Sequence, residues 1–184
     1  MVHDAPLIKE ERLSPDNFRF VEFFAGTGNL TAAVAKAGVP TDPPDDLLTG
    51  GLDFGKTEDI EQMKAYLAGL SSSGVKLMVH LAPPCATFSR ARDRSWKTRL
   101  RSTLRPQGLL GKGSQCKEAN VVARNALNLL EYAVTELGAA ASMENPRSSY
   151  LWSFLDFDPE IPFADFVFSP CRFGATYMSS HRLR

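Results

Sequence analysis

The sequence predicts an α/β domain with a mostly parallel sheet and helices on both faces of that sheet. Short runs rich in β-branched and aromatic residues, typical of buried strands, alternate with longer segments whose apolar residues recur at helical spacing. Such alternation is characteristic of parallel sheets covered by helices on both sides. We expect strands at 20–24, 76–81, 139–143 and 163–168, and helices at 30–37, 58–70, 118–137 and 148–155.

The segment 39–47, between the first two predicted helices, contains three prolines, Pro40, Pro43 and Pro44. Proline cannot donate to a strand ladder, so any strand there is predicted to be short and irregular. Residues 1–18 mix proline and charge with little periodicity. We expect them to form a loose lead-in to a single domain that spans 19–184.

The composition is that of an ordinary globular protein, with 43% hydrophobic and 23% charged residues. No apolar run reaches the length of a membrane span, and the first ten residues lack the apolar stretch of a signal peptide, so we expect no membrane association. The three cysteines, Cys85, Cys116 and Cys171, do not suggest a disulfide framework. They favour a reducing, intracellular compartment, either nucleus or cytoplasm.

Charge is unevenly distributed along a chain whose formal net charge is zero. The segment 90–117, which we call the basic segment, holds nine Lys or Arg residues and a single acid, Asp93. A basic stretch in a neutral protein suggests a local anionic partner, although a solvated charged loop is the simpler alternative. The segment is also rich in Gly and Pro between Pro106 and Gly113, so we expect it to be mobile.

Two glycines, Gly26 and Gly28, directly follow the first predicted strand and precede a helix. Glycines allow a ligand to approach the backbone closely, and a helix N-terminus offers free N–H groups. A tight turn without a ligand is an equally good interpretation. The loop lacks the third glycine of a dinucleotide fingerprint and the Gly-Lys-Ser/Thr of a P-loop.

Cys85 lies in the segment Ala82-Pro83-Pro84-Cys85-Ala86-Thr87-Phe88-Ser89, which follows the strand at 76–81. The two prolines stiffen the loop, so the thiol is presented from a fixed backbone. A cysteine is often only a small core residue. Here, however, the adjoining basic segment is expected to lower the thiol pKa, which favours a nucleophile.

Glu144 and Asn145 follow the apolar stretch at 139–143. A carboxylate is costly to bury at such a place and is expected to point outward or to be paired. In the simpler interpretation Asn145 is a helix N-cap and Pro146 is the first helical residue, which leaves Glu144 unexplained.

Taken together and in this order, the loops resemble the cytosine-C5 DNA methyltransferase family. The resemblance rests on Phe24-x-Gly26-x-Gly28, on Pro83-Pro84-Cys85-x-x-Phe88-Ser89 and on Glu144-Asn145, and it covers residues 20–155. It implies a Rossmann-like S-adenosylmethionine-dependent methyltransferase fold. It also implies S-adenosylmethionine as methyl donor and a cytosine flipped out of double-stranded DNA as acceptor.

The residue types suit that chemistry. A thiolate from Cys85 would add to C6 of the pyrimidine and make C5 nucleophilic, and it is a good leaving group afterwards. Glu144, with a pKa raised by its apolar strand, would hydrogen-bond to N3 as an acid. By resemblance, cofactor contacts are expected from Phe24, Gly26, Gly28, Leu30, Asp53 and Pro83, and nucleic-acid contacts from Ser89, Arg90, Arg92 and Arg94. No metal site is predicted.

The chain departs from the family pattern in four ways. Pro146 stands where family members have valine. The acid expected to bind the cofactor ribose is not decided among Asp42, Asp45 and Asp46, and an exposed loop acid remains an alternative for Asp53. The family's Gln-x-Arg-x-Arg segment has no good match, because Arg182 and Arg184 have the spacing but lie far from Phe173-Gly174. No target-recognition domain follows, so a second chain or domain is expected to supply recognition.

Two other function classes stay open at this level. The first is a domain of the same fold that binds nucleic acid through the basic segment without catalysis. The second is an RNA cytosine-C5 methyltransferase, whose nucleophile is a later cysteine. Cys171 is the candidate for that role, in the wrong motif context, and it is otherwise expected in the core.

Overall fold

The computed structural model describes residues 17–169 and 180–184. Cys171 and Phe173-Gly174 lie outside these residues. The elements are β1 (Phe18–Phe23), α1 (Asn29–Lys36), the 3₁₀ turn η2 (Leu47–Thr49), α2 (Thr57–Ser72), β2 (Lys76–Leu81), the 3₁₀ turn η3 (Arg90–Arg94), α3 (Gly113–Thr135), β3 (Ala140–Pro146), α4 (Leu151–Phe154), β4 (Phe166–Phe168) and β5 (His181–Leu183).

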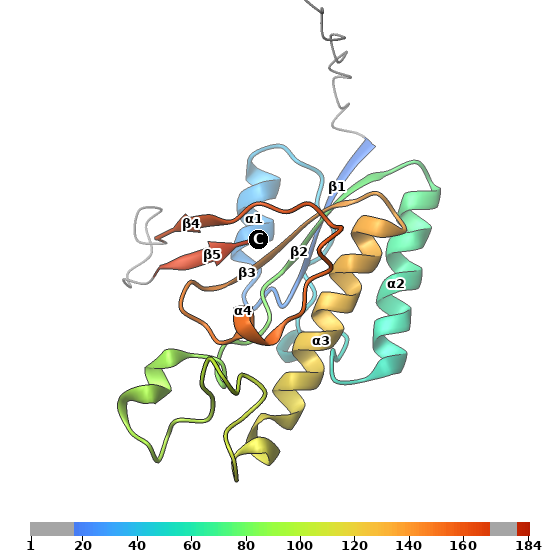
Figure 1. Cartoon of the computed structure of the whole chain (residues 1–184). Coiled ribbons are helices and arrows are strands. Elements are labelled where there is room, and N and C mark those ends of the chain that lie inside the picture. The colour runs from blue at the N-terminus through green and yellow to red at the C-terminus, as the bar shows by residue number, and fades with distance from the viewer. Residues whose placement is uncertain (1–16, 170–179) are drawn as a thin grey trace, which may run out of the picture.

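One five-stranded sheet with the order β1-β2-β3-β5-β4 forms the centre of the domain (Figure 1). The strands β1, β2 and β3 are parallel, whereas β5 runs antiparallel to both β3 and β4. The domain is therefore α/β, compatible with a Rossmann-like fold, but its sheet is mixed rather than mostly parallel as predicted, because β5 enters it in the opposite direction. Because β1, β2 and β3 run in the same direction, the segments that follow them meet at one edge of the sheet, where open α/β sheets bind ligands.

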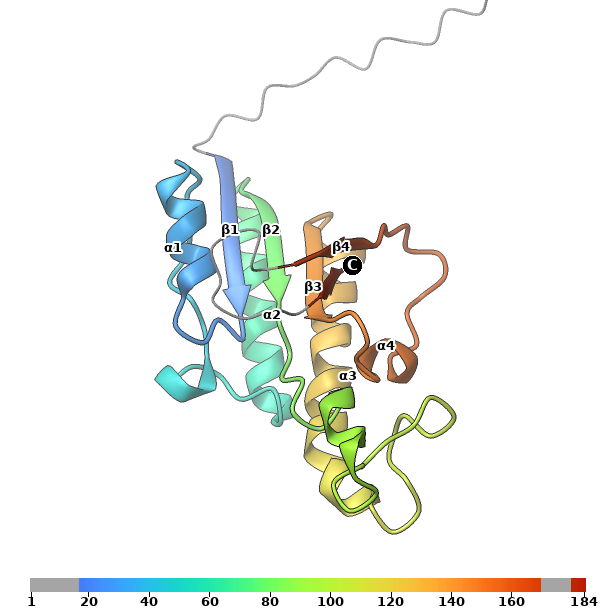
Figure 2. The same cartoon turned by 90° about the vertical axis from the view of Figure 1, so that its left-hand side faces the viewer.

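The two faces of the sheet differ chemically, because successive side chains of a strand point to opposite sides. Val21 and Phe23 of β1 belong to the apolar core that α2 and α3 complete. Glu22 points the other way, toward α1, which packs on β1. Figures 1 and 2 show α2 and α3 together beside the sheet and α1 next to β1. Helices on both faces were predicted, and this prediction is confirmed.

The polar face carries a row of ionisable and polar side chains that run across neighbouring strands. Glu22 of β1 is paired in register with His80 of β2, and His80 with Ser142 of β3. All three are buried. They lie on the same face as Glu144, which is two residues after Ser142 in β3. The face thus combines burial with polarity, which is unusual for a sheet that only supports a core.

Most elements lie where the periodicity predicts them. The strand at 76–81 has the predicted bounds, and the proline-containing segment 39–47 forms two isolated parallel bridges with β1, Phe20 to Thr41 and Phe23 to Asp45. The structure thus has isolated bridges and no named strand there, in agreement with the prediction that any strand in this segment is short and irregular. Within the described residues no helix is long and apolar enough to cross a membrane.

Four predicted boundaries are wrong. Glu144, Asn145 and Pro146 belong to β3 rather than to a loop after it, because β5 pairs with them and prolongs the strand. The helix expected from residue 118 starts at Gly113, so 113–117 of the basic segment are helical. The helix expected at 148–155 is only the single turn Leu151–Phe154. The strand expected at 163–168 is limited to β4, Phe166–Phe168.

Candidate functional site

The turn between β1 and α1 requires glycine for geometric reasons. Phe24, Gly26 and Gly28 all have positive φ, of 60°, 56° and 70°. A Cβ on Gly28 would lie 2.9 Å from Cγ of Pro44. The backbone N–H of Gly26 donates to Oδ2 of Asp46 at 2.8 Å. The turn is therefore held against the segment that follows α1, and Gly28 has a steric role that does not depend on a ligand.

The side chain of Glu22 in β1 binds the first turn of α1. Its Oε2 accepts hydrogen bonds from the backbone N–H of Thr31 at 2.8 Å and from Oγ1 of Thr31 at 2.5 Å. A carboxylate at a helix N-terminus satisfies a free N–H group and interacts favourably with the helix dipole. Sequence reasoning missed this role of Glu22, because an acid inside the apolar run 18–23 has no visible partner until α1 is placed.

Cys85 sits at the start of a tight turn after β2. The backbone N–H groups of Phe88 and Ser89 both donate to the carbonyl oxygen of Cys85, at 2.9 and 2.8 Å. The side-chain amide of Asn145 donates to the carbonyl oxygen of Pro83 at 2.7 Å. Asn145 is thus a buried residue of β3 that ties the proline loop to the sheet, and the interpretation as a helix N-cap is wrong. Pro83 is buried, and its carbonyl oxygen is the acceptor of this hydrogen bond.

The Cys85 thiol is half-buried, and its pKa differs from the prediction. Burial raises the pKa of Cys85, and the negative charge of Glu144 raises it further. The expected lowering by the basic segment is therefore wrong. Arg90 and Arg92, the first two arginines after Ser89, donate to backbone carbonyl oxygens instead.

Glu144 is paired, as expected of a carboxylate at that position. Its Oε1 contacts Nδ1 of His181, a residue of β5 that sequence reasoning missed. Both side chains are largely buried, with 21% and 16% of their surface exposed. Because β5 pairs with β3, His181 lies against Glu144 although it is far along the chain. The neighbouring Arg182 and Arg184 point to the other face, over the ring of Trp152.

Two adjoining cavities open at this edge of the sheet. The larger, of about 780 Å³, is lined on one side by the glycine turn and on the other by Glu144 and His181. The smaller, of about 290 Å³, contains three carboxylates and several apolar side chains. Phe24 and Ala82 line both cavities. The predicted residues distribute as follows: Phe24, Gly26, Leu30 and Glu144 line the larger cavity, Phe24 and Asp53 line the smaller, and Gly28, Pro83 and Cys85 line neither.

The structure separates the acids that the sequence leaves undecided. Asp42 is paired with Arg19 at 3.0 Å and with the hydroxyl of Tyr66, outside both cavities. Asp46 accepts backbone hydrogen bonds on both of its oxygens. Asp45 lines the smaller cavity, and its buried Oδ1 has no hydrogen-bond partner among the described residues. Burial is the largest cause that raises the pKa of Asp45.

Asp53, also at the smaller cavity, accepts a hydrogen bond from the N–H of Gly55 at 2.7 Å and lies 3.8 Å from Nζ of Lys56. These two contacts hold the Asp53 side chain in place at the cavity wall.

The basic segment packs against the domain through particular residues. Ser89 accepts a hydrogen bond from the N–H of Ala91 and caps η3. Arg90 donates to the carbonyl oxygen of Ser148 at 2.9 Å and lies over the ring of Tyr150, and Arg92 donates to the carbonyl oxygen of Thr98. Arg94 is exposed. Of the four predicted nucleic-acid contacts, three thus have intramolecular partners as well.

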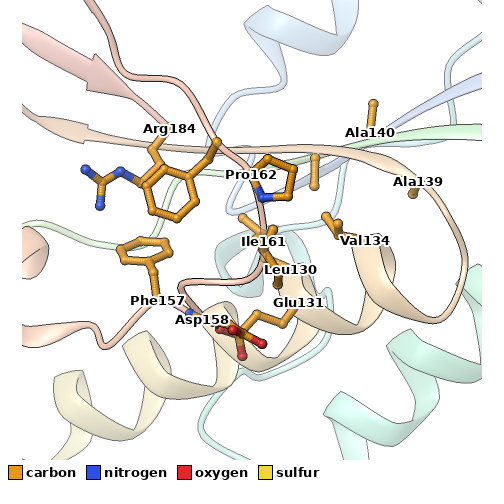
Figure 3. Close-up of a pocket in the computed structure, with 12 residues that line it drawn as sticks. Leu130, Glu131, Val134, Ala139, Ala140, Phe157, Asp158, Ile161, Pro162 and Arg184 are labelled. Carbon is orange, nitrogen blue, oxygen red and sulfur yellow. Dashed lines mark hydrogen bonds between the residues drawn. The ribbon is translucent and has the colours of Figure 1, made fainter.

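A third cavity, of about 280 Å³, lies away from these residues (Figure 3). It is formed by the C-terminal half of α3, the start of β3 and the segment 157–163, with Arg184 at one side. Arg184 makes two hydrogen bonds to Asp165, at 2.8 and 2.7 Å, and lies over the ring of Phe163. None of the predicted site residues lines this cavity, so it is not part of the candidate site.

The site so defined belongs to an α/β domain with its ionisable side chains gathered at the carboxyl edge of parallel strands, the usual ligand-binding edge of this class. Within residues 17–169 and 180–184, no group of His, Cys, Asp or Glu side chains is arranged to hold a metal ion. Comparison with protein-family models and with curated proteins gives no match.

Proposed function

We propose that this domain is an S-adenosylmethionine-dependent methyltransferase that acts on C5 of cytosine in DNA through a Cys85 adduct. The observation that carries the proposal is the proximity of two chemically matched groups. A fixed turn after β2 presents Cys85, and Asn145, the residue after Glu144 in the neighbouring strand β3, is hydrogen-bonded to the carbonyl oxygen of Pro83 in the same loop. The charge of Glu144 also raises the pKa of the Cys85 thiol. A nucleophile and an acid are the two groups that addition to a pyrimidine needs.

Each residue has a defined role in that addition. The Cys85 thiolate forms a bond to C6 of the ring, and the electrons of the C5–C6 double bond shift so that C5 becomes nucleophilic. Glu144, in its protonated form, donates a hydrogen bond to N3 and stabilises the charge that develops on the ring. After C5 has taken the methyl group, a base removes the C5 proton, the electrons of that C–H bond re-form the C5–C6 double bond, and the Cys85 thiolate leaves C6.

The contact between Glu144 and His181 holds the carboxyl group in place at the cavity wall. The Nδ1 atom of His181 faces Oε1 of Glu144 along the wall of the larger cavity. We infer that His181 fixes the orientation of the Glu144 carboxyl group toward the ring.

The two adjoining cavities support the cofactor part of the proposal by their combined size and by their lining. Sites for ligands of this size are mostly apolar clefts of about 300–1,000 Å³ with a few polar groups. Phe24, Leu52 and Phe54 give the smaller cavity its apolar wall, and Oδ1 of Asp45 is an unpartnered acceptor for a ribose hydroxyl. Asp53 would accept from the adenine amine, as the family resemblance implies. When bound there, S-adenosylmethionine supplies an electrophilic methyl group for C5.

A target base inside a stacked duplex cannot reach Cys85, so the proposal includes base flipping. The basic segment directly follows the turn that holds Cys85, and it lies beyond the edge of the sheet in both views (Figures 1 and 2). Its charge is suited to DNA phosphates next to the flipped base.

Calorimetric titration with S-adenosylmethionine tests the cofactor part of the proposal. We expect binding by the unmodified chain, and Asp45→Asn should weaken it about tenfold, equal to ~1.4 kcal/mol, by removing a charged acceptor for the ribose. Glu136→Gln makes the same change of charge at an exposed position outside the cavities and should leave the affinity unchanged. No binding by the unmodified chain at millimolar cofactor would contradict the proposal.

A further inference from the structure

Arg101 differs from every other arginine of the basic segment because it is fully buried. Its exposed fraction is 0%, and no carboxylate among the described residues forms an ion pair with it. A buried cation without a counter-ion is costly unless its donors are satisfied. Such a residue is expected where a particular geometry must be maintained.

The guanidinium group of Arg101 is satisfied by neutral acceptors from three parts of the chain. Its Nε donates to the carbonyl oxygen of Thr87 at 3.0 Å, and its Nη2 donates to Oγ1 of Thr87 at 2.8 Å. Its Nη1 donates to the carbonyl oxygen of Pro106 at 2.5 Å and to Oδ1 of Asn120 at 2.6 Å. The group also lies 3.7 Å from the ring centre of Phe88. Because its donors point into the protein, Arg101 is not available to contact phosphate.

These contacts converge on the turn that presents the Cys85 thiol. Thr87 and Phe88 lie inside that turn, which closes on the carbonyl oxygen of Cys85. On the side of the sheet, Asn145 donates a hydrogen bond to the carbonyl oxygen of Pro83, in the proline pair that precedes Cys85. Arg101, a residue of the basic segment, contacts Thr87 and Phe88, which follow Cys85 in the turn. The nucleophile is therefore held between two anchors, one from β3 and one from the basic segment.

We propose that Arg101 is a positioning residue that sets the exposure and orientation of the Cys85 thiol by fixing the turn 85–89. It also connects that turn to the basic segment through Pro106 and to α3 through Asn120. The catalytic consequence rests on the proposed function: without Arg101, Cys85 is no longer aimed at C6, so kcat falls while cofactor affinity stays the same. The effect on the thiol itself is independent of any enzymatic activity.

The test measures alkylation of Cys85 by iodoacetamide across pH, with peptide mass spectrometry to separate Cys85 from the other cysteines. In Arg101→Ala the turn loosens and the thiol becomes more exposed. Because burial is the main cause that raises the pKa of Cys85, the midpoint of the alkylation profile should move to lower pH. The rate at neutral pH should rise several-fold. Thr87→Val removes only the Oγ1 acceptor, so it should shift the alkylation profile in the same direction but by less. This milder variant provides the test if Arg101→Ala does not fold.

Two further variants separate positioning from charge. Arg101→Lys keeps the charge but cannot bind the four acceptors at once, so its profile should resemble that of Arg101→Ala. Arg124→Ala removes an exposed arginine that lies over Phe154 without contacting the turn, and its profile should match the unmodified chain. Profiles of Arg101→Lys and Thr87→Val that coincide with the unmodified chain would overturn the proposal, whether or not the chain methylates DNA.

Discussion

The Glu144 carboxyl group opposes the reactivity of the Cys85 thiol in the resting protein, but it assists the addition of Cys85 in the proposed reaction. In the resting protein the negative charge of Glu144 raises the thiol pKa and suppresses the thiolate. During addition to cytosine a protonated Glu144 instead stabilises the ring. The same carboxyl group thus has opposite effects in the resting protein and in the proposed reaction, and His181 contacts it.

This coupling predicts an unusual pair of effects for Glu144→Gln. Removing the negative charge lowers the thiol pKa, so Cys85 should react faster with iodoacetamide at neutral pH. Methyl transfer should nevertheless fall by roughly 10²-fold or more, because an amide cannot act as the acid for N3. Parallel assays of alkylation and of methyl transfer from labelled cofactor measure both effects, with Glu136→Gln as the control. Alkylation and methylation changing in the same direction would contradict the assigned roles.

At the scale of single residues, the sequence is informative where chemistry depends on residue type within a short motif. Cys85 and Glu144 are proposed in that way, and in the structure they lie on neighbouring parallel segments, Cys85 after β2 and Glu144 in β3. His181 and Arg101 are not identifiable, since their roles depend on contacts across long sequence separations. In the sequence Arg101 is one basic residue among nine in its segment, and only its burial distinguishes it.

At the scale of elements, the turn between β1 and α1 shows which glycine is needed for geometry. Gly28 has φ of 70°, and a Cβ there would meet Pro44 at 2.9 Å. Gly28→Ala should therefore lower the free energy of unfolding by about 1–3 kcal/mol through backbone strain and steric contact. Urea unfolding followed by circular dichroism measures the change.

Gly69 provides the matched control within α2. A Cβ at Gly69 would have no atom within 4 Å, and its φ is not positive. Gly69→Ala should therefore stabilise the protein by about 0.5–1 kcal/mol, since alanine has the better helix propensity. Equal effects of the two substitutions would show that the turn geometry described for Gly28 is wrong.

Elements could be predicted from sequence where their stability comes from a local pattern. The strand β2 has a continuous apolar run and was predicted with its correct bounds, and α2 and α3 were found from helical spacing. The extension of β3 through Glu144 could not be predicted, because it depends on pairing with the three residues His181–Leu183. A three-residue strand has too few residues to show periodicity.

At the scale of the whole molecule, the sheet separates an apolar face that makes the core from a polar face that borders the larger cavity. His80, in the middle of that face, is buried, and its Nδ1 lies 2.9 Å from Oγ of Ser142. Burial lowers the pKa of His80 from 6.5 to about 4. The neutral form is therefore favoured in the folded state, and the unfolded chain binds a proton more readily.

The sign of the pH dependence follows directly. Below pH 6.5 the unfolded state binds more protons than the folded state, so stability falls with decreasing pH until about pH 4, where the folded protein also becomes protonated. The loss from this group is on the order of 3 kcal/mol. His80→Gln, which does not titrate, should remove that part of the dependence in urea unfolding measured at several pH values. An unchanged pH dependence in His80→Gln would contradict the assignment.

The central claim is that Cys85 forms a covalent bond to C6 of cytosine during methyl transfer. The most direct measurement uses duplex DNA in which 5-fluorocytosine replaces cytosine in many sequence contexts, together with S-adenosylmethionine. Fluorine at C5 cannot leave as a proton does, so the adduct persists after methyl transfer. We expect a denaturation-resistant protein–DNA complex that maps to the Cys85 peptide, is absent in Cys85→Ala and is retained in Cys171→Ala. No complex with the unmodified chain, or a complex that is lost in Cys171→Ala instead, would contradict the claim.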